Sequence, residues 1–384
     1  MRFVHTSDWH VGKLLRGRSR ADEHRAVLAE IAEVVDEVQA DAVLVAGDLY
    51  DSAAPPPEAD EIVIDTLLRL GRTGAAVVVI TGNHDNARRL RALRPLFQRS
   101  GVTLLAEPVP AAAGGVHSLT TRAGEPVHVA MVPFVSQRGI VRAEQLMAGA
   151  AFEHAQAYAA RLHAVIDQLC REFRPDAVNV LMAHAFVTGG VAGGGERAAH
   201  LVEEYGVAAP SFPATAGYVA LGHLHRAQVL AGATAIHYCG SPLALDFGET
   251  SDPKQVNVVD IAPGLPARVT PRTLRAGHPL RSYAGTVDEL RVAVADDDAW
   301  LRLVVREPHR AGLGDQVREL FGDRVVDVRI EAPDRAMAAT APTRRGRTPQ
   351  ELFDEYLAVQ GVVDPAVRAL FGELHDAVVE GPDA

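Results

Sequence analysis

The chain has 384 residues, 48% of them hydrophobic and 23% charged, as in ordinary globular proteins of more than one domain. The formal net charge of −11 argues against binding nucleic acid by bulk attraction, and the two cysteines, Cys170 and Cys239, provide neither a disulfide framework nor a thiolate zinc site. The chain start lacks a secretory pattern, and no apolar run reaches the ~18 residues of a membrane span. We therefore expect a cytoplasmic protein without membrane contact.

Strand and helix patterns alternate along the first 85 residues. We predict strand, helix, strand, helix and strand in turn, over residues 2–6, 22–39, 42–46, 58–70 and 75–80. This alternation favours parallel βαβ units, whose ligand sites lie beyond the carboxyl ends of the strands. Less regular signals follow, with strands over 128–133, 177–182, 218–221 and 256–261 and a helix over 151–170.

The character of the chain changes near residue 267. We expect a main domain over 1–266 and a small α+β capping domain over 267–337, the latter with strand, helix, strand, helix and strand over 279–283, 286–291, 300–305, 313–321 and 325–330. A Pro/Thr/Arg-rich stretch predicts a linker over 338–348. The tail, 349–384, is predicted to hold helices over 349–359 and 365–379.

Five short motifs follow predicted strands, and each carries Asp, Asn or His. They are Asp8-Trp9-His10, Gly47-Asp48-Leu49-Tyr50-Asp51, Gly82-Asn83-His84-Asp85, Ala183-His184 and Gly222-His223-Leu224-His225. Mixed carboxylate and imidazole ligands suit divalent ions such as manganese, iron or zinc. Two such ions can activate a water and stabilise an in-line phosphoryl displacement. We expect Gly47, Gly82 and Gly222 to leave room for sharp backbone turns beside the metals.

The ordered series resembles the calcineurin-like metallophosphoesterase superfamily. The resemblance implies a four-layer α/β fold, with two sheets sandwiched between helices, and a binuclear metal centre. It implies that one ion is held by Asp8, His10, Asp48 and His225, and the other by Asp48, Asn83, His184 and His223.

His84 is not a ligand in this resemblance; it contacts the scissile phosphate and can protonate the leaving oxygen. Asp51 matches the residue that usually orients this histidine, although a loop-capping carboxylate is an equally reasonable interpretation. For Asp85 we expect a cap on the helix that begins near Ala87.

Two longer segments narrow the family. Residues 7–13 (SDWHVGK) and 238–249 (YCGSPLALDFGE) resemble the SbcD family, the nuclease subunits of bacterial SbcCD complexes. This resemblance implies a manganese-dependent nuclease, an exonuclease on duplex ends and an endonuclease on hairpins and single strands. It further implies action in DNA repair and recombination, an SbcC-like ATPase partner, and a homodimer within a heterotetramer.

Basic and apolar side chains supply candidate contacts for these partners. Candidates for phosphate contacts on DNA follow the first and third motifs: Lys13, Arg16, Arg18, Arg88 and Arg89. For each, a solvated surface with local ion pairs is the plainer interpretation. The tail presents an apolar face that would dock on the ATPase, formed by Leu352, Phe353, Tyr356 and Leu357, unless these helices pack back on their own chain.

Two other functions remain open. A small-molecule phosphodiesterase could use the same metal site, but it would not need the chain beyond residue 267. A DNA-end scaffold with a decayed site is the second alternative, and the complete set of ligands with His84 argues against it.

Overall fold

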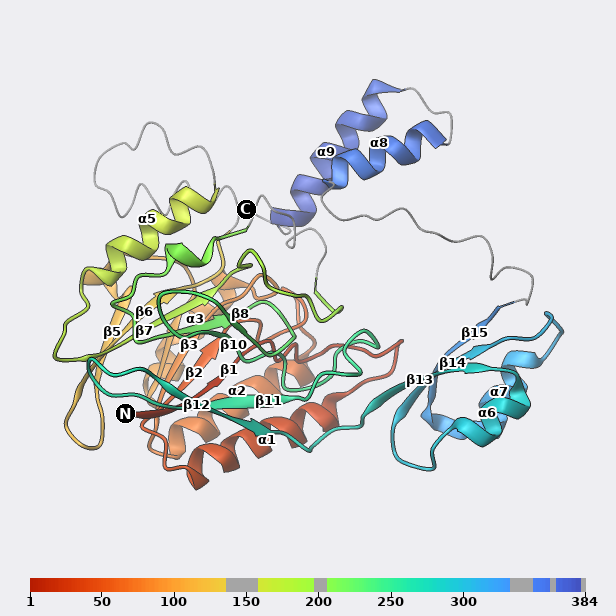
Figure 1. Cartoon of the computed structure of the whole chain (residues 1–384), viewed down its shortest axis with the longest axis horizontal. Helices are drawn as coiled ribbons and strands as arrows, with labels where there is room; N and C mark the ends of the chain where they lie inside the picture. Colours follow the sequence, from red (N-terminus) through yellow and green to blue (C-terminus); the bar gives the residue numbers. More distant parts are fainter. Residues whose placement is uncertain (136–157, 197–205, 332–347, 360–363, 381–384) are drawn as a thin grey trace.

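The computed structural model contains two six-stranded β-sheets packed face to face and a separate three-stranded sheet (Figure 1). It describes residues 1–135, 158–196, 206–331, 348–359 and 364–380. Within these ranges no helix has the length and apolar character that crossing a membrane requires.

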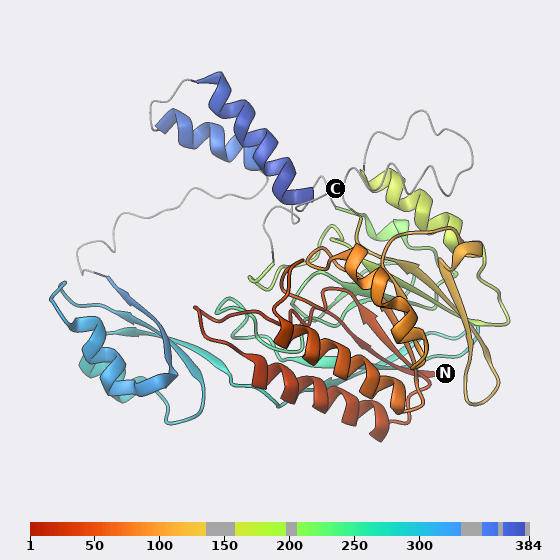
Figure 2. The same cartoon turned by 180° about the vertical axis from the view of Figure 1, so that it is seen from behind.

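The first sheet has the strand order β12-β11-β1-β2-β3-β4. Its strands are β1 (Arg2–Thr6), β2 (Ala42–Ala46), β3 (Ala76–Ile80), β4 (Val102–Leu105), β11 (Gln255–Asp260) and β12 (Arg268–Thr273). β1 to β4 run parallel, joined by α1 (Ala21–Glu37), α2 (Pro57–Arg72) and α3 (Ala87–Gln98). These helices cover the outer face of the sheet (Figure 2), as the predicted βαβ units require.

The second sheet has the order β5-β6-β7-β8-β10-β9. It comprises β5 (Val116–Thr120), β6 (Pro126–Val132), β7 (Val178–His184), β8 (Tyr218–Gly222), β9 (Gln228–Leu230) and β10 (Ile236–Tyr238). Helix α5 (Tyr158–Cys170) packs on its outer face. The predicted helix over 151–170 is therefore seen from Tyr158, and its earlier residues lie outside the described ranges. Short 3₁₀ turns occur at Ala111–Ala113, Ala209–Ser211 and Gly322–Arg324.

A third apolar layer lies between the two sheets. Because side chains alternate along a strand, Leu44 of β2 points into this layer while Val43 and Val45 pack against the helices. Met182 of β7 and Ala220 of β8 meet it from the other sheet. The four-layer sandwich expected from the sequence is confirmed.

One domain boundary differs from the expectation. β12 lies beyond residue 266, yet it pairs antiparallel with β11 along its whole length and extends the first sheet. Its alternating polar residues are typical of an edge strand, which resembles an appendage when the pairing is not known. The strand belongs to the sandwich, and the capping unit begins after it.

The capping unit is a parallel three-stranded sheet with two helices. Its elements are β13 (Leu280–Gly285), α6 (Val287–Ala293), β14 (Trp300–Val305), α7 (Leu313–Phe321) and β15 (Val325–Ile330). It has its own apolar core and lies beside the sandwich (Figure 1).

The tail forms two helices, α8 (Pro349–Val359) and α9 (Pro365–Glu380), close to the predicted bounds. They pack on each other through stacked rings of Phe353 and Phe371, whose centroids are 3.9 Å apart. Apart from Thr348, the predicted linker lies outside the described residues.

Candidate metal centre

The five motifs meet at one end of the sandwich, at or just beyond the carboxyl ends of β1, β2, β3, β7 and β8. Except for half-buried Asn83, the expected ligands and His84 are at most 5% exposed. The first two loops run side by side, because the Asp8 amide donates to the Gly47 carbonyl at 2.9 Å and the His10 amide to the Asp48 carbonyl at 3.1 Å.

Backbone strain is concentrated in these loops. Asp8, His10, Asp48 and His223 have φ angles of +53°, +47°, +51° and +106°, in the left-handed region that non-glycine residues rarely adopt. Such conformations persist where the surrounding structure holds them, and they cluster at functional sites.

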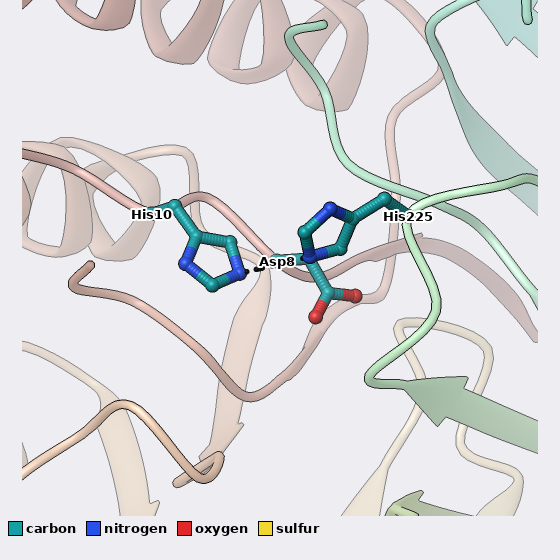
Figure 3. Close-up of side chains that lie close together, drawn as sticks. All are labelled: Asp8, His10 and His225. Carbon is teal, nitrogen blue, oxygen red and sulfur yellow. Dashed lines mark hydrogen bonds between the residues drawn. The ribbon is translucent and has the colours of Figure 1, made fainter. Parts of the chain in front are cut away.

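Asp8, His10 and His225 form a first group of donors (Figure 3). The Nε2 atoms of His10 and His225 face each other at 3.1 Å. The Asp8 carboxylate accepts the His223 amide at 3.0 Å and the Ser7 hydroxyl at 2.5 Å, which fixes its orientation.

Asp48 lies between this group and a second one. Its Oδ2 is 3.4 Å from Nε2 of His10 and 3.4 Å from Nε2 of His184. In the second group, Asn83 Oδ1 lies 2.9 Å from His184 Nε2 and 2.9 Å from His223 Nδ1. Asp48 therefore contacts a histidine of each group.

The chemistry of these donors fits divalent cations. Asp8 and Asp48 are buried carboxylates close to each other, an arrangement that is costly unless cations compensate it. Burial, together with the charge of Asp48, raises the pKa of Asp8. Burial opposes ionisation of Asp48 as well, but the neighbouring His184 and His84 bring its pKa well below the usual value. Oxygen and imidazole donors of this kind suit borderline divalent metals.

His84 is held by the backbone of Asp51 rather than by its carboxylate. His84 Nδ1 lies 2.7 Å from the Asp51 carbonyl oxygen, and the His84 amide donates to Asp48 Oδ1 at 2.8 Å. The Asp51 carboxylate instead forms an ion pair with Lys13 at 3.0 Å and lies 3.5 Å from His10 Nδ1. Asp51 therefore contacts the ring of His84, although not through the group that we expected.

The expected helix cap at Asp85 is wrong. Helix α3 is capped by Asn86, whose side chain accepts the Arg89 amide at 3.0 Å. Asp85 points the other way and accepts the amides of Gly82, Tyr50 and Leu49 at 2.9, 3.0 and 3.3 Å. It therefore ties the second motif to the third.

Two glutamates support His225, and sequence reasoning assigned a role to neither. Glu249 Oε1 lies 2.9 Å from His225 Nδ1, and Glu196 Oε1 accepts the His225 amide at 2.9 Å. Burial opposes ionisation of Glu249, but His225 and Lys254 lower its pKa to about 2. Glu249 ends the second segment that narrowed the family, so its place in that motif was the available signal.

The three motif glycines stand where a side chain would collide with the site. A Cβ atom on Gly82 would overlap the Asp48 carboxylate, and one on Gly222 would overlap the Ala46 carbonyl. Gly47 additionally has a φ of +94°. The expectation that these positions need glycine is confirmed.

The expected DNA contacts are dispersed. Arg16 lies 3.5 Å from Asp246 and 3.4 Å from Asp327, and the Arg18 guanidinium lies 4.4 Å from the centroid of the Trp300 ring. Both therefore contact or face the capping unit. Arg89 pairs with Asp60 and Lys13 with Asp51, whereas Arg88 is exposed at the start of α3.

The four tail residues do not share one exposed face. Leu357 is buried, and Leu352 and Phe353 are partly buried. Tyr356 is 57% exposed, and Leu370 and Leu374 of α9 are exposed to a similar degree. An apolar surface therefore remains on the helix pair, with a composition different from the expected one.

Comparison with known proteins gives consistent matches. Residues 1–227 match the calcineurin-like phosphoesterase family. The SbcD subunit of nuclease SbcCD from Bacillus subtilis is 36% identical over 319 residues, covering 80% of this chain and 79% of the relative. The SbcD subunit from Escherichia coli strain K12 is 31% identical, covering 80% and 76%, and that from Rhodobacter capsulatus is 31% identical, covering 92% and 93%.

Proposed function

The chain belongs to the calcineurin-like phosphoesterase family and, within it, to the SbcD family of SbcCD nuclease subunits, and on this premise we propose that it is a metal-dependent DNA nuclease. It acts in the cytoplasm with an SbcC-like ATPase, cutting duplex ends as an exonuclease and hairpins or single strands as an endonuclease in double-strand break repair. The observation that carries this proposal is the convergence of seven metal-type donors and His84 in a chain with these relatives.

The centre would hold two divalent ions, for which we propose manganese. Asp8, His10 and His225 would hold one, Asn83, His184 and His223 the other, and Asp48 would contact both. When bound, such ions supply an activated water and offset the negative charge that develops at phosphorus.

The protein's own part in the reaction centres on His84. Because the Asp51 carbonyl accepts a hydrogen bond from Nδ1, the ring is held in one orientation, and we assign proton transfer to Nε2. We assign that proton to the leaving 3′-oxygen. The ring lies 4.5 Å from that of His10 between centroids, so it is adjacent to the metal ligands.

For the partners, we propose a DNA contact at Arg88, which is exposed, and one at Lys13, whose ion-pair partner Asp51 also lies 3.5 Å from His10 of the metal centre. Arg16, Arg18 and Arg89 are engaged elsewhere within the chain. Tyr356 with Leu370 and Leu374 would dock on the ATPase, with Leu352, Phe353 and Leu357 supporting them from inside the helix pair. The assembly would be a homodimer within a heterotetramer.

The deciding experiment measures degradation of end-labelled linear duplex DNA with manganese, with and without the ATPase and ATP. His84→Ala should retain bound metal and lose most activity, whereas Asp48→Ala should lose metal. Full activity in His84→Ala would remove this histidine from the mechanism. Cleavage of a model phosphodiester alone, with the partner present, would instead identify a small-molecule phosphodiesterase.

A further inference from the structure

Glu249 makes a buried contact with one histidine of the metal centre. Its side chain is fully buried, and Oε1 lies 2.9 Å from His225 Nδ1. The other oxygen, Oε2, accepts from Lys254 Nζ at 2.6 Å, the Leu245 amide at 3.1 Å and the Ser241 hydroxyl at 3.2 Å. Four contacts therefore hold the carboxylate in place.

This contact sets the tautomer of His225. A carboxylate accepts and does not donate, so Nδ1 must carry the hydrogen and Nε2 the lone pair. His225 Nε2 is the atom that faces His10 Nε2 in the first donor group. The lone pair is thus directed at the place where the ion shared with Asp8 and His10 would lie.

His184, a histidine of the second donor group, contacts a neutral acceptor instead. His184 Nδ1 lies 2.8 Å from the backbone carbonyl of Ala46, a neutral acceptor. A charged acceptor on the remote nitrogen makes an imidazole a more basic ligand than a neutral one does. His225 and His184 therefore differ in the charge of the group that contacts their remote ring nitrogen.

We propose that Glu249 is a positioning residue for the ion of the Asp8, His10 and His225 group. The inference rests on the proposed function and adds which of the two ions depends on Glu249. Outer partners of metal-bound histidines typically change metal affinity by about 10- to 100-fold when removed. We expect Glu249→Ala to weaken the binding of this ion by that factor and to leave the affinity for the other ion unchanged.

The test is a manganese titration of the full chain, followed by electron paramagnetic resonance. Wild-type protein should give the spin-coupled signal of two bound manganese ions. Over the same concentrations, Glu249→Ala should give only the signal of a single bound ion. Glu249→Gln keeps an acceptor oxygen without the charge, so its loss should be smaller.

Two failures can be told apart. If both Glu249 variants bind two manganese ions with wild-type affinity while the wild-type protein is an active nuclease, this inference alone is overturned. Wild-type protein that binds no manganese would overturn the proposed function and the inference with it. If Glu249→Ala does not fold, Glu249→Gln decides, because wild-type affinity for both ions in that variant contradicts the inference.

Discussion

The indole Nε1 of Trp300 donates a hydrogen bond of 2.9 Å to Glu23, which joins the capping unit to helix α1 of the sandwich. Glu23 also receives two hydrogen bonds from Arg20, at 2.9 and 2.7 Å, and the amide of His278 at 2.8 Å. The Arg20 side chain is fully buried, and it donates to the Ala244 carbonyl as well. A single carboxylate therefore anchors the capping unit and neutralises a buried guanidinium.

Replacing Glu23 by alanine should destabilise the protein by about 3–5 kcal/mol, because Arg20 would stay buried without its counter-charge. The measurement is urea unfolding followed by circular dichroism. Asp22→Ala is the matched control, since Asp22 lies on the same turn, pairs with Arg25 and is 99% exposed. That change should cost less than about 1 kcal/mol. Equal costs for the two variants would contradict this account of the junction.

Gly82→Ala should abolish tight metal binding. The added Cβ would overlap the Asp48 carboxylate, which must move from its position between His10 and His184. Manganese binding by calorimetry provides the readout. Gly314→Ala in helix α7 is a suitable control, because its Cβ would meet only the flexible end of Arg318 at 3.5 Å. This variant should bind metal normally and gain up to about 1 kcal/mol of stability, because alanine favours a helix more than glycine does. Normal metal binding by Gly82→Ala would refute the steric argument.

Stability should fall on acidification through His5. This residue is buried between the sheets, with Nδ1 3.0 Å from the Tyr218 hydroxyl, and burial, with the charge of His237, lowers its pKa to about 3. In the unfolded chain His5 takes up a proton near pH 6.5, whereas in the folded chain it stays neutral until the pH is near 3. The stabilisation that comes from neutral, buried His5 is therefore complete above pH 6.5 and is lost as the pH falls toward 3. The loss should reach about 3 kcal/mol at pH 4.

The comparison for His5 is with His5→Gln, which cannot titrate. Between pH 7 and pH 4 the free energy of unfolding of wild type should fall by about 3 kcal/mol more than that of the variant. Other buried histidines contribute to both proteins equally. Parallel curves would show that His5 is protonated in the folded protein.

Asp85→Ala should both destabilise the protein and weaken metal binding. The change removes the acceptor of three backbone amides. Leaving one such amide unpaired in the interior lowers the free energy of unfolding by about 1–3 kcal/mol. Asp85→Asn keeps one acceptor oxygen and should lose less. Thermal unfolding with and without manganese measures both effects. An alanine variant as stable as the asparagine variant would mean that these amides find other partners.

The sequence by itself determined the order of the elements and the motifs that supply the candidate metal donors, and the resemblance of those motifs to a known superfamily indicated the sandwich. Hydrophobic periodicity is a local property, so the βαβ alternation from β1 to β3 and the pattern of the capping unit could be predicted. Asp8 and Asp48 follow buried strands and His184 ends one, and parallel strands bring their carboxyl ends to one edge of a sheet. Gly47, Gly82 and Gly222 were predictable as well, because they lie in the motifs at the ends of these strands, where the backbone must turn beside the donors.

Only the tertiary structure decided contacts between residues that are distant in sequence or that depend on side-chain direction. β12 joined the first sheet because pairing with β11 depends on register, which its polar alternation does not reveal. Asp51 turned its carbonyl to His84 and its carboxylate to Lys13, although its position in the motif is the same for both outcomes. Glu249 reached His225 and Glu23 reached Trp300 because folding placed these side chains together in the interior, where a buried charge must find a partner.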